Sequence, residues 1–134
     1  DSLQEIICRC KQVLLVEDNE LNLEIAVELL KYAGLNITTA KNGLEGLDKF
    51  KAAPPGTYAL ILMDIQMPVM NGLEAAKAIR ALPVKDAQTV PIVAMTANAF
   101  PEDIAATLQA GMNEHLSKPI DLEQFHSILQ KWCQ

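Results

Sequence analysis

Acidic, hydroxyl and amino side chains directly follow four short apolar runs of the 134-residue sequence. They are Glu17 with Asp18, Asp64, Thr96 and Lys118. Three carboxylates at one place repel each other, and Mg²⁺ relieves this repulsion because it prefers oxygen ligands. A remaining carboxylate could then act as a nucleophile and form an acyl phosphate. The ammonium and the hydroxyl could bind the oxygens of the transferring phosphoryl group, so these residue types predict phosphoryl transfer if the fold gathers them.

The apolar runs predict the strands of a sheet. The five runs are 13–16, 36–39, 59–63, 92–95 and 115–117. Four of them are continuously apolar instead of alternating, which is typical of buried parallel strands. Stretches with helical spacing separate them, and right-handed crossovers then predict an α/β fold with a doubly wound, five-stranded parallel sheet and about five helices.

Several residues mark where the helices begin and end. Asn42 and Asn71 each precede Gly-Leu-Glu, the spacing of a helix N-cap with a glutamate three residues later. Gly34 is expected to end the first helix in a left-handed conformation. The apolar side of that helix is expected to centre near Ile25, Ala26 and Leu29. The stretch 82–91 reads as a loop of little regularity.

In an open α/β sheet, ligands bind at the carboxyl ends of the strands. Four of the five predicted strands end in a carboxylate, a hydroxyl or an ammonium, while the second ends in Thr39 and Ala40. Because the strands are parallel, these polar residues are expected to meet at one rim of the sheet.

Composition excludes several classes of function. The chain has 11 basic and 17 acidic residues, a net charge of −6, and only 4% aromatic residues. This balance argues against direct binding to nucleic acid or to an anionic membrane. Half of the residues are apolar, which excludes general disorder. Cys8, Cys10 and Cys133 are expected to be reduced, and the domain is expected to be cytoplasmic.

Four motifs give a more specific indication. They are Val16-Glu17-Asp18-Asn19, Leu62 to Gly72 (LMDIQMPVMNG), Val93-Ala94-Met95-Thr96-Ala97 and Leu116-Ser117-Lys118-Pro119. Together they resemble the receiver domain of two-component response regulators, from about Lys11 to Lys131. The resemblance implies a flavodoxin-like fold with strand order 2-1-3-4-5.

The resemblance also implies a role for each residue of the site. Glu17, Asp18 and Asp64 would bind Mg²⁺ together with the backbone carbonyl of Gln66, and Asp64 would be the phosphoacceptor. Thr96 and Lys118 would bind the phosphoryl oxygens. The Lys118–Pro119 peptide bond is expected to be cis. The isolated domain would then catalyse its own phosphorylation and dephosphorylation, while the parent protein could be a histidine kinase.

Three positions depart from the pattern of that family. Glu17 and Asn71 stand where Asp is more common, and His115 stands where Tyr or Phe is usual. By the resemblance, Thr96 and the ring at position 115 would form the switch that follows phosphorylation; the alternative is that His115 is only a strand-edge residue. Gln66 and Asn98 flank the site and are expected to tune the rate of hydrolysis.

The resemblance is strongest to receivers that are fused to hybrid sensor histidine kinases. It rests on Asn19, Asn22 and the segment 111–116. Residues 1–11 are then expected to be a linker stub and residues 12–134 the receiver domain, with a parent protein that could be membrane-anchored. The partner would be a histidine kinase or a histidine phosphotransfer domain. Leu23 and Val27 lie beside the polar arc of the first helix and are expected to be partly exposed for docking, the alternative being an ordinary core stripe.

Other functions fit the residues less well. A stand-alone or effector-linked response regulator is the main alternative. A phosphorylation-independent scaffold would be expected to lack Asp18, Asp64 or Lys118. A flavodoxin-like cofactor binder would need a phosphate loop where Glu17-Asp18-Asn19-Glu20 stands, and an aspartyl phosphatase usually has Asp at the place of Gln66.

Overall fold

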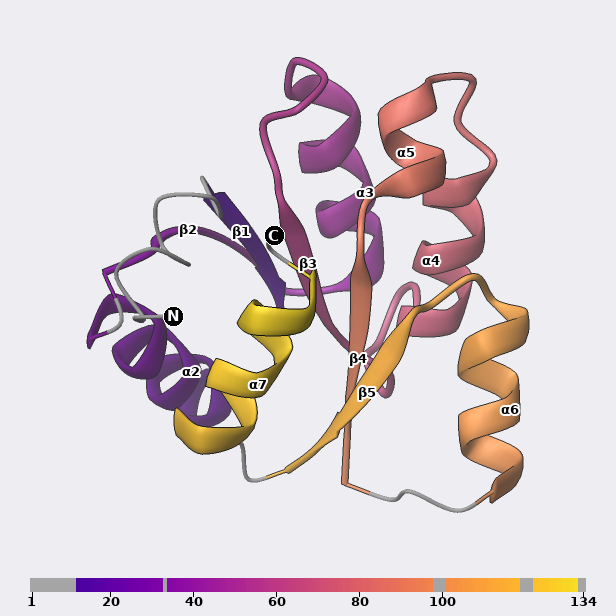
Figure 1. Ribbon diagram of the computed structural model, residues 1–134. Coiled ribbons are helices and arrows are strands. Elements are labelled where there is room, and N and C mark those ends of the chain that lie inside the picture. Colours follow the sequence, from indigo (N-terminus) through magenta and orange to yellow (C-terminus); the bar gives the residue numbers. More distant parts are fainter. Residues whose placement is uncertain (1–11, 33, 98–100, 119–121, 133–134) are drawn as a thin grey trace.

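A single parallel sheet forms the centre of the molecule (Figure 1). The computed structural model describes residues 12–32, 34–97, 101–118 and 122–132. The strands are β1 (Gln12–Val16), β2 (Asn36–Ala40), β3 (Leu60–Asp64), β4 (Ile92–Thr96) and β5 (Glu114–Ser117). Their order is β2-β1-β3-β4-β5, and every pairing is parallel. The predicted fold class and strand order are therefore confirmed.

Helices cover both faces of the sheet (Figure 1). They are α2 (Glu20–Tyr32), α3 (Gly43–Ala52), α4 (Gly72–Arg80), α5 (Lys85–Thr89), α6 (Pro101–Gln109) and α7 (Leu122–Trp132). One core layer joins α2 and α7 to alternate strand residues such as Val13 and Leu15. The other joins α3, α4 and α5 to the intervening residues, such as Leu14 and Val16. This alternation follows from the period of two along a strand.

The described residues form six helices, whereas the sequence predicts about five. The additional helix is α5, which lies in part of the stretch predicted to be a loop. Ala87 of α5 is buried, and Asp86 accepts a hydrogen bond from the backbone N–H of Gly56 at 3.1 Å. Five residues are too few to show a helical period. Tertiary packing and not local sequence therefore explains this helix, so the loop prediction was wrong for 85–89.

The predicted helix ends are confirmed at three of the sites. The side chains of Asn42 and Asn71 cap α3 and α4, and Asn71 forms a reciprocal capping box with Glu74. Gly34 has a φ of 86°, the left-handed conformation expected after α2. The three cysteines lie outside the described residues.

The orientation of α2 differs from the prediction. Ala26 and Leu30 are buried, whereas Ile25 is 47% exposed. Adjacent positions on a helix differ by about 100°, so an Ala26–Leu30 axis necessarily turns Ile25 away from the core. Ile25 was therefore wrongly placed at the core-facing centre.

Among the described residues, we find no helix with both the length and the apolar character needed to span a membrane.

Arg80, the last residue of α4, connects three segments at the end of the sheet where the strands begin. Its guanidinium donates hydrogen bonds to the backbone oxygen of Gly111 at 2.9 Å, to that of Ala87 at 3.0 Å and to Asn113 Oδ1 at 2.9 Å. Asn113 Oδ1 also accepts from the backbone N–H of Ile92. The Arg80 side chain thereby holds α4, α5 and the segment leading into β5 together.

Replacing Arg80 with methionine should lower the free energy of unfolding by about 2 kcal/mol, because three acceptors lose a charged donor while the aliphatic packing is kept. Urea denaturation measures the change. Lys77→Met, at an exposed position of the same helix, is the control and should change stability by less than about 0.5 kcal/mol. Equal effects of the two substitutions would contradict a structural role for the Arg80 hydrogen bonds.

Candidate functional site

The polar residues that follow the strands meet at one rim of the sheet, as predicted. They line a cleft of about 190 Å³ that is formed by residues at the ends of β1, β3, β4 and β5 and by Asn22 of α2. Its lining includes all five residues predicted for the chemistry: Glu17, Asp18, Asp64, Thr96 and Lys118. The parallel sheet produces this convergence because all its strands end on the same side.

Glu17 is held rigidly at the end of β1. Its backbone N–H donates to the carbonyl of Ala40 at 3.0 Å, which extends the pairing of β1 with β2 by one residue. Its side chain is buried, and Oε2 accepts a hydrogen bond from the backbone N–H of Asn19 at 3.2 Å. Asp18, the next residue, is exposed and completes the acidic part of the cleft.

Lys118 lies between the two buried carboxylates. Its Nζ is 2.9 Å from Glu17 Oε1 and 3.1 Å from Asp64 Oδ1. Its backbone N–H donates to the carbonyl of Thr96 at 2.8 Å, which fixes the segment after β5 against the end of β4. Burial lowers the pKa of the Lys118 ammonium, but the hydrogen bonds and charges of Glu17 and Asp64 outweigh burial and raise it overall.

Asp64 is the last residue of β3 and is only 5% exposed. Burial raises the pKa of its carboxyl to about 7, and the charge of Glu17 acts in the same direction, while Lys118 opposes both. An ordinary aspartate has a pKa of about 4. Further positive charge in the cleft would therefore favour the ionised form of Asp64.

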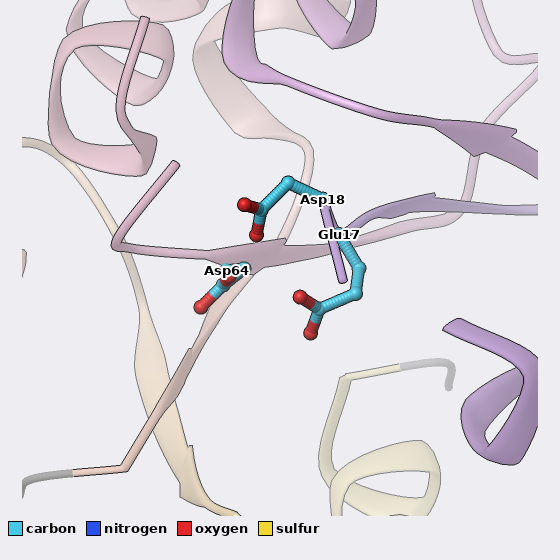
Figure 2. Close-up of side chains that lie close together, drawn as sticks. All are labelled: Glu17, Asp18 and Asp64. Atoms are coloured by element: carbon cyan, nitrogen blue, oxygen red, sulfur yellow. The ribbon is translucent and has the colours of Figure 1, made fainter. Parts of the chain in front are cut away.

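The three carboxylates fit a divalent cation. Each of Glu17, Asp18 and Asp64 offers an oxygen, and these oxygens all lie within 4.8 Å of one another. Figure 2 shows the three side chains gathered where β1 and β3 end. When ionised, the three carboxylates carry three negative charges, and the ammonium of Lys118 balances one of them. A divalent cation would balance the other two. An all-oxygen donor set favours Mg²⁺ or another hard cation.

The loop that follows Asp64 packs closely beneath the cleft. The N–H of Gly72 donates to the carbonyl of Ile65 at 2.9 Å. A side-chain Cβ at Gly72 would collide with the backbone oxygen of Asp64, so the start of α4 can approach the site only without a side chain. Gln66, in the same loop, is exposed and lines the cleft.

The family model described as the response regulator receiver domain matches residues 13–130. The chain belongs to this family. The receiver domain of sensor histidine kinase PA1611 from Pseudomonas aeruginosa PAO1 is a structural neighbour, with a TM-score of 0.83, 36% identity, and coverage of 92% of this chain and 98% of that one. That neighbour was crystallised with a magnesium ion coordinated in its active site cleft.

Two further similarities concern partners and parent proteins. The chain is also similar to a co-crystal structure of the Saccharomyces cerevisiae histidine phosphotransfer signaling protein Ypd1 and the receiver domain of its downstream response regulator Ssk1. The TM-score is 0.80 with 33% identity, and the match covers 92% of this chain and 89% of that one. The peroxide stress-activated histidine kinase mak1 of Schizosaccharomyces pombe is 38% identical over 118 residues. That match covers 87% of this receiver domain but 7% of mak1, so the chain spans a small part of such relatives.

Several predicted residues of the receiver domain lie away from the carboxylate cluster. His115 is half-buried on β5, opposite Ala94 of β4. Leu23 and Val27 are partly exposed, as predicted, and they also pack against the core layer of α2 and α7. Asn98 and the Lys118–Pro119 bond cannot be placed, because residues 98–100 and 119–121 lie outside the described part of the chain.

Sequence reasoning missed two features of the receiver domain's cleft. Asn19 and Asn22, which were noticed only for their resemblance to hybrid kinases, line the cleft beside Asp18. The contact between Lys118 and Glu17 was also not predicted. Only the extra methylene of Glu17 relative to aspartate could have indicated that this carboxylate reaches towards the end of β5.

Proposed function

We propose that this receiver domain accepts a phosphoryl group on Asp64 from a phosphohistidine partner, in a Mg²⁺-dependent step of a phosphorelay. The observation that carries the proposal is the position of Lys118, whose Nζ lies 3.1 Å from Asp64 Oδ1 inside a cleft with three carboxylates. A buried nucleophile, a fixed ammonium and a cation site are what phosphoryl transfer to a carboxylate needs.

The carboxylates of Glu17, Asp18 and Asp64, with the backbone carbonyl of Gln66, would hold Mg²⁺. When bound, the ion supplies positive charge that favours the ionised form of Asp64 and neutralises phosphoryl oxygens. Glu17 is buried and accepts a hydrogen bond from Asn19, so this ligand is preorganised by the end of β1. The magnesium reported for the PA1611 receiver supports the choice of ion.

In the transfer step, a carboxylate oxygen of Asp64 forms a bond to phosphorus while the bond from phosphorus to the imidazole nitrogen breaks. The electron pair of the broken bond stays on that nitrogen, and an acyl phosphate results. The ammonium of Lys118 and the hydroxyl of Thr96 bind phosphoryl oxygens, on which the charge of the transition state is spread. The Lys118 ammonium is already held in the cleft by Glu17 and Asp64, so it needs little reorganisation.

After transfer, Thr96 moves towards the phosphate and His115 follows, which changes the surface that partners recognise. Hydrolysis resets the domain when water attacks phosphorus and releases inorganic phosphate from Asp64. Gln66 and Asn98 tune the rate of this hydrolysis. Substitution of either residue without a change in the lifetime of the phosphorylated form would contradict that role.

We assign residues 12–134 to the receiver domain of a hybrid sensor histidine kinase and residues 1–11 to the linker before it. The similarity to mak1 supports this origin. The partner would be a histidine kinase or a histidine phosphotransfer domain, as the Ypd1–Ssk1 complex of the yeast neighbour suggests. Leu23 and Val27 of α2 would contribute to its docking.

Alanine at Leu23 should slow phosphoryl transfer from phosphorylated Ypd1 by about three- to tenfold, because truncating one apolar contact typically weakens an interface by about 1 kcal/mol. It should not slow labelling by acetyl phosphate, which needs no docking surface. Rapid-quench measurements with each donor test this expectation. Equal slowing with both donors would assign Leu23 to the core alone.

The first experiment on the proposed function measures intact-protein mass after incubation with acetyl phosphate and Mg²⁺. One added phosphoryl group is expected, and it should be absent from Asp64→Asn and from a sample with EDTA. An adduct that persists in Asp64→Asn would place the phosphoacceptor elsewhere. If neither an adduct nor Mg²⁺-dependent binding of beryllofluoride is seen, the domain is a phosphorylation-independent scaffold.

A further inference from the structure

The five methionines of the chain differ in how well an oxidant in solution can reach them. Three are buried, with exposed fractions of 0%, 1% and 3%: Met63, Met95 and Met112. The other two, Met67 and Met70, are half-buried, and both lie in the loop between Asp64 and α4. A thioether is oxidised only where the oxidant can contact its sulfur. The two methionines open to oxidation therefore both lie in the loop that follows the proposed phosphoacceptor.

Met67 and Met70 anchor this loop to the rest of the domain. Both side chains pack against the core layer of α3, α4 and α5. The backbone N–H of Met70 donates to the carbonyl of Pro68 at 2.7 Å, and the Met70 carbonyl accepts from the N–H of Gly43 at 2.9 Å. The loop is thus attached to the core on both sides of Pro68 and Val69.

The loop depends on these two anchors because its central residue disfavours the conformation that it adopts. Val69 has a φ of 69°, a left-handed conformation that a branched side chain makes unfavourable. Its own side chain is 77% exposed and adds little packing. Such a conformation persists only where the surrounding structure holds it, and the neighbours that pack on the core are Met67 and Met70. The same loop contains Gln66, which lines the cleft.

We propose that Met67 and Met70 form a redox-sensitive modification site, at which hydrogen peroxide lowers the ability of Asp64 to accept a phosphoryl group. The thioether sulfur forms a bond to one peroxide oxygen while the O–O bond breaks. The other oxygen leaves as hydroxide and takes the proton of the transferred oxygen, which gives water. Sulfur is oxidised to a sulfoxide and peroxide is reduced. The effect on Asp64 rests on the proposed function, whereas the modification itself does not.

The sulfoxide would weaken both anchors. It converts an apolar side chain into a polar one, and burying its oxygen against the core layer without a hydrogen-bond donor is unfavourable. The oxidised side chains should therefore leave the core layer, and the loop that carries Gln66 should shift. Displacing a positioned group by about 1 Å can slow a reaction by up to about 100-fold, so we expect labelling of Asp64 to fall at least threefold.

The test treats the full chain with hydrogen peroxide and then with dithiothreitol, which reverses disulfides and sulfenic acids of cysteine but leaves methionine sulfoxides. Peptide mass spectrometry should find the sulfoxide at Met67 and Met70, and at least about tenfold less at the buried methionines, including Met95 in the cleft. Labelling by acetyl phosphate and Mg²⁺ should fall at least threefold. It should recover after treatment with methionine sulfoxide reductases A and B.

The double variant Met67→Leu with Met70→Leu is the matched control, because leucine has a similar volume and cannot be oxidised. It keeps the three cysteines and the three buried methionines. Relative to its own untreated sample, its labelling should change less than about twofold after peroxide. An equal loss of labelling in this variant would overturn the inference. Normal labelling of the oxidised wild type, or no sulfoxide at Met67 and Met70, would overturn it as well.

Failure of acetyl phosphate to label the untreated wild type would instead overturn the proposed function. The effect of the modification on the loop is then read from amide hydrogen exchange of residues 65–71, which should become faster after oxidation of the wild type and not of the double variant. An unchanged exchange rate in the oxidised wild type would overturn the inference.

Discussion

Replacing Asp64 with asparagine should raise the free energy of unfolding of the metal-free protein at pH 8 by about 2–4 kcal/mol. The reason is that the Asp64 carboxyl has a higher pKa in the folded than in the unfolded state, and a difference of one pKa unit corresponds to about 1.4 kcal/mol. Burial raises the pKa of the Asp64 carboxyl to about 7, and the charge of Glu17 adds to this effect. In the unfolded chain the same carboxyl ionises near pH 4. Asparagine has the shape of the protonated carboxyl and never ionises, so the folded state no longer has to accommodate a buried charge.

The pH dependence follows from the sign of this shift. Because the folded state binds the Asp64 proton more tightly than the unfolded state, the contribution of Asp64 to stability is fully present below about pH 4. It is lost as the pH rises to about 7, the pKa of the folded state. The stability advantage of Asp64→Asn should therefore be small at pH 4 and should approach its full value at pH 8.

Urea denaturation of both proteins in EDTA, at intervals from pH 4 to pH 8, measures the expected difference. Asp48→Asn, at an exposed position of α3, serves as the control and should stay within about 0.5 kcal/mol of the wild type. An Asp64→Asn variant that is less stable than the wild type at pH 8 would mean that Lys118 compensates fully for the burial of this carboxylate. Added Mg²⁺ should stabilise the wild type more than the variant, because ligand binding to the folded state adds to its stability.

The cleft could be predicted from the sequence because it depends on strand ends alone. Once the apolar runs were recognised as parallel strands, the residues after them had to meet at one rim, and Asp64, Thr96 and Lys118 do so. The motif resemblance then supplied roles that spacing could not give. In a parallel sheet, residues far apart in the sequence become neighbours because all strands end on the same side. No pattern that links these distant residues in the sequence is needed to predict that they meet.

Features that depend on side-chain reach or tertiary packing could not be predicted. Ile25 and Ala26 are adjacent in the sequence. Packing of α2 against the sheet buries Ala26 and leaves Ile25 exposed. Val69 has a left-handed backbone conformation that its branched side chain disfavours, while the neighbouring Met70 forms hydrogen bonds with Pro68 and Gly43 that fix the loop. Such a conflict between local preference and tertiary context cannot be predicted from the residue type.

Removing the ammonium of Lys118 should have the largest effect on chemistry while leaving the acidic cluster intact. Lys118→Met should slow the labelling of Asp64 by acetyl phosphate by about 100-fold or more, which is the typical loss when one preorganised donor to a reacting oxygen is removed. Glu17, Asp18 and Asp64 all remain, and their oxygens still lie together in the cleft. Mg²⁺ should therefore bind at least as tightly as in the wild type, because a competing positive charge is gone from Glu17 and Asp64.

These two readouts separate recognition of the phosphoryl group from binding of the ion. Titration calorimetry measures Mg²⁺ affinity and intact mass follows labelling, with Lys41→Met as a control. Lys41 is an exposed lysine that follows β2 at the same rim, so its removal changes the local charge without touching the cleft residues. If Lys118→Met lost Mg²⁺ affinity and labelling together, Lys118 would act by holding Glu17 in place. Unchanged labelling would remove Lys118 from the chemistry, and phosphoryl recognition would then fall to Thr96 and the backbone of the cleft.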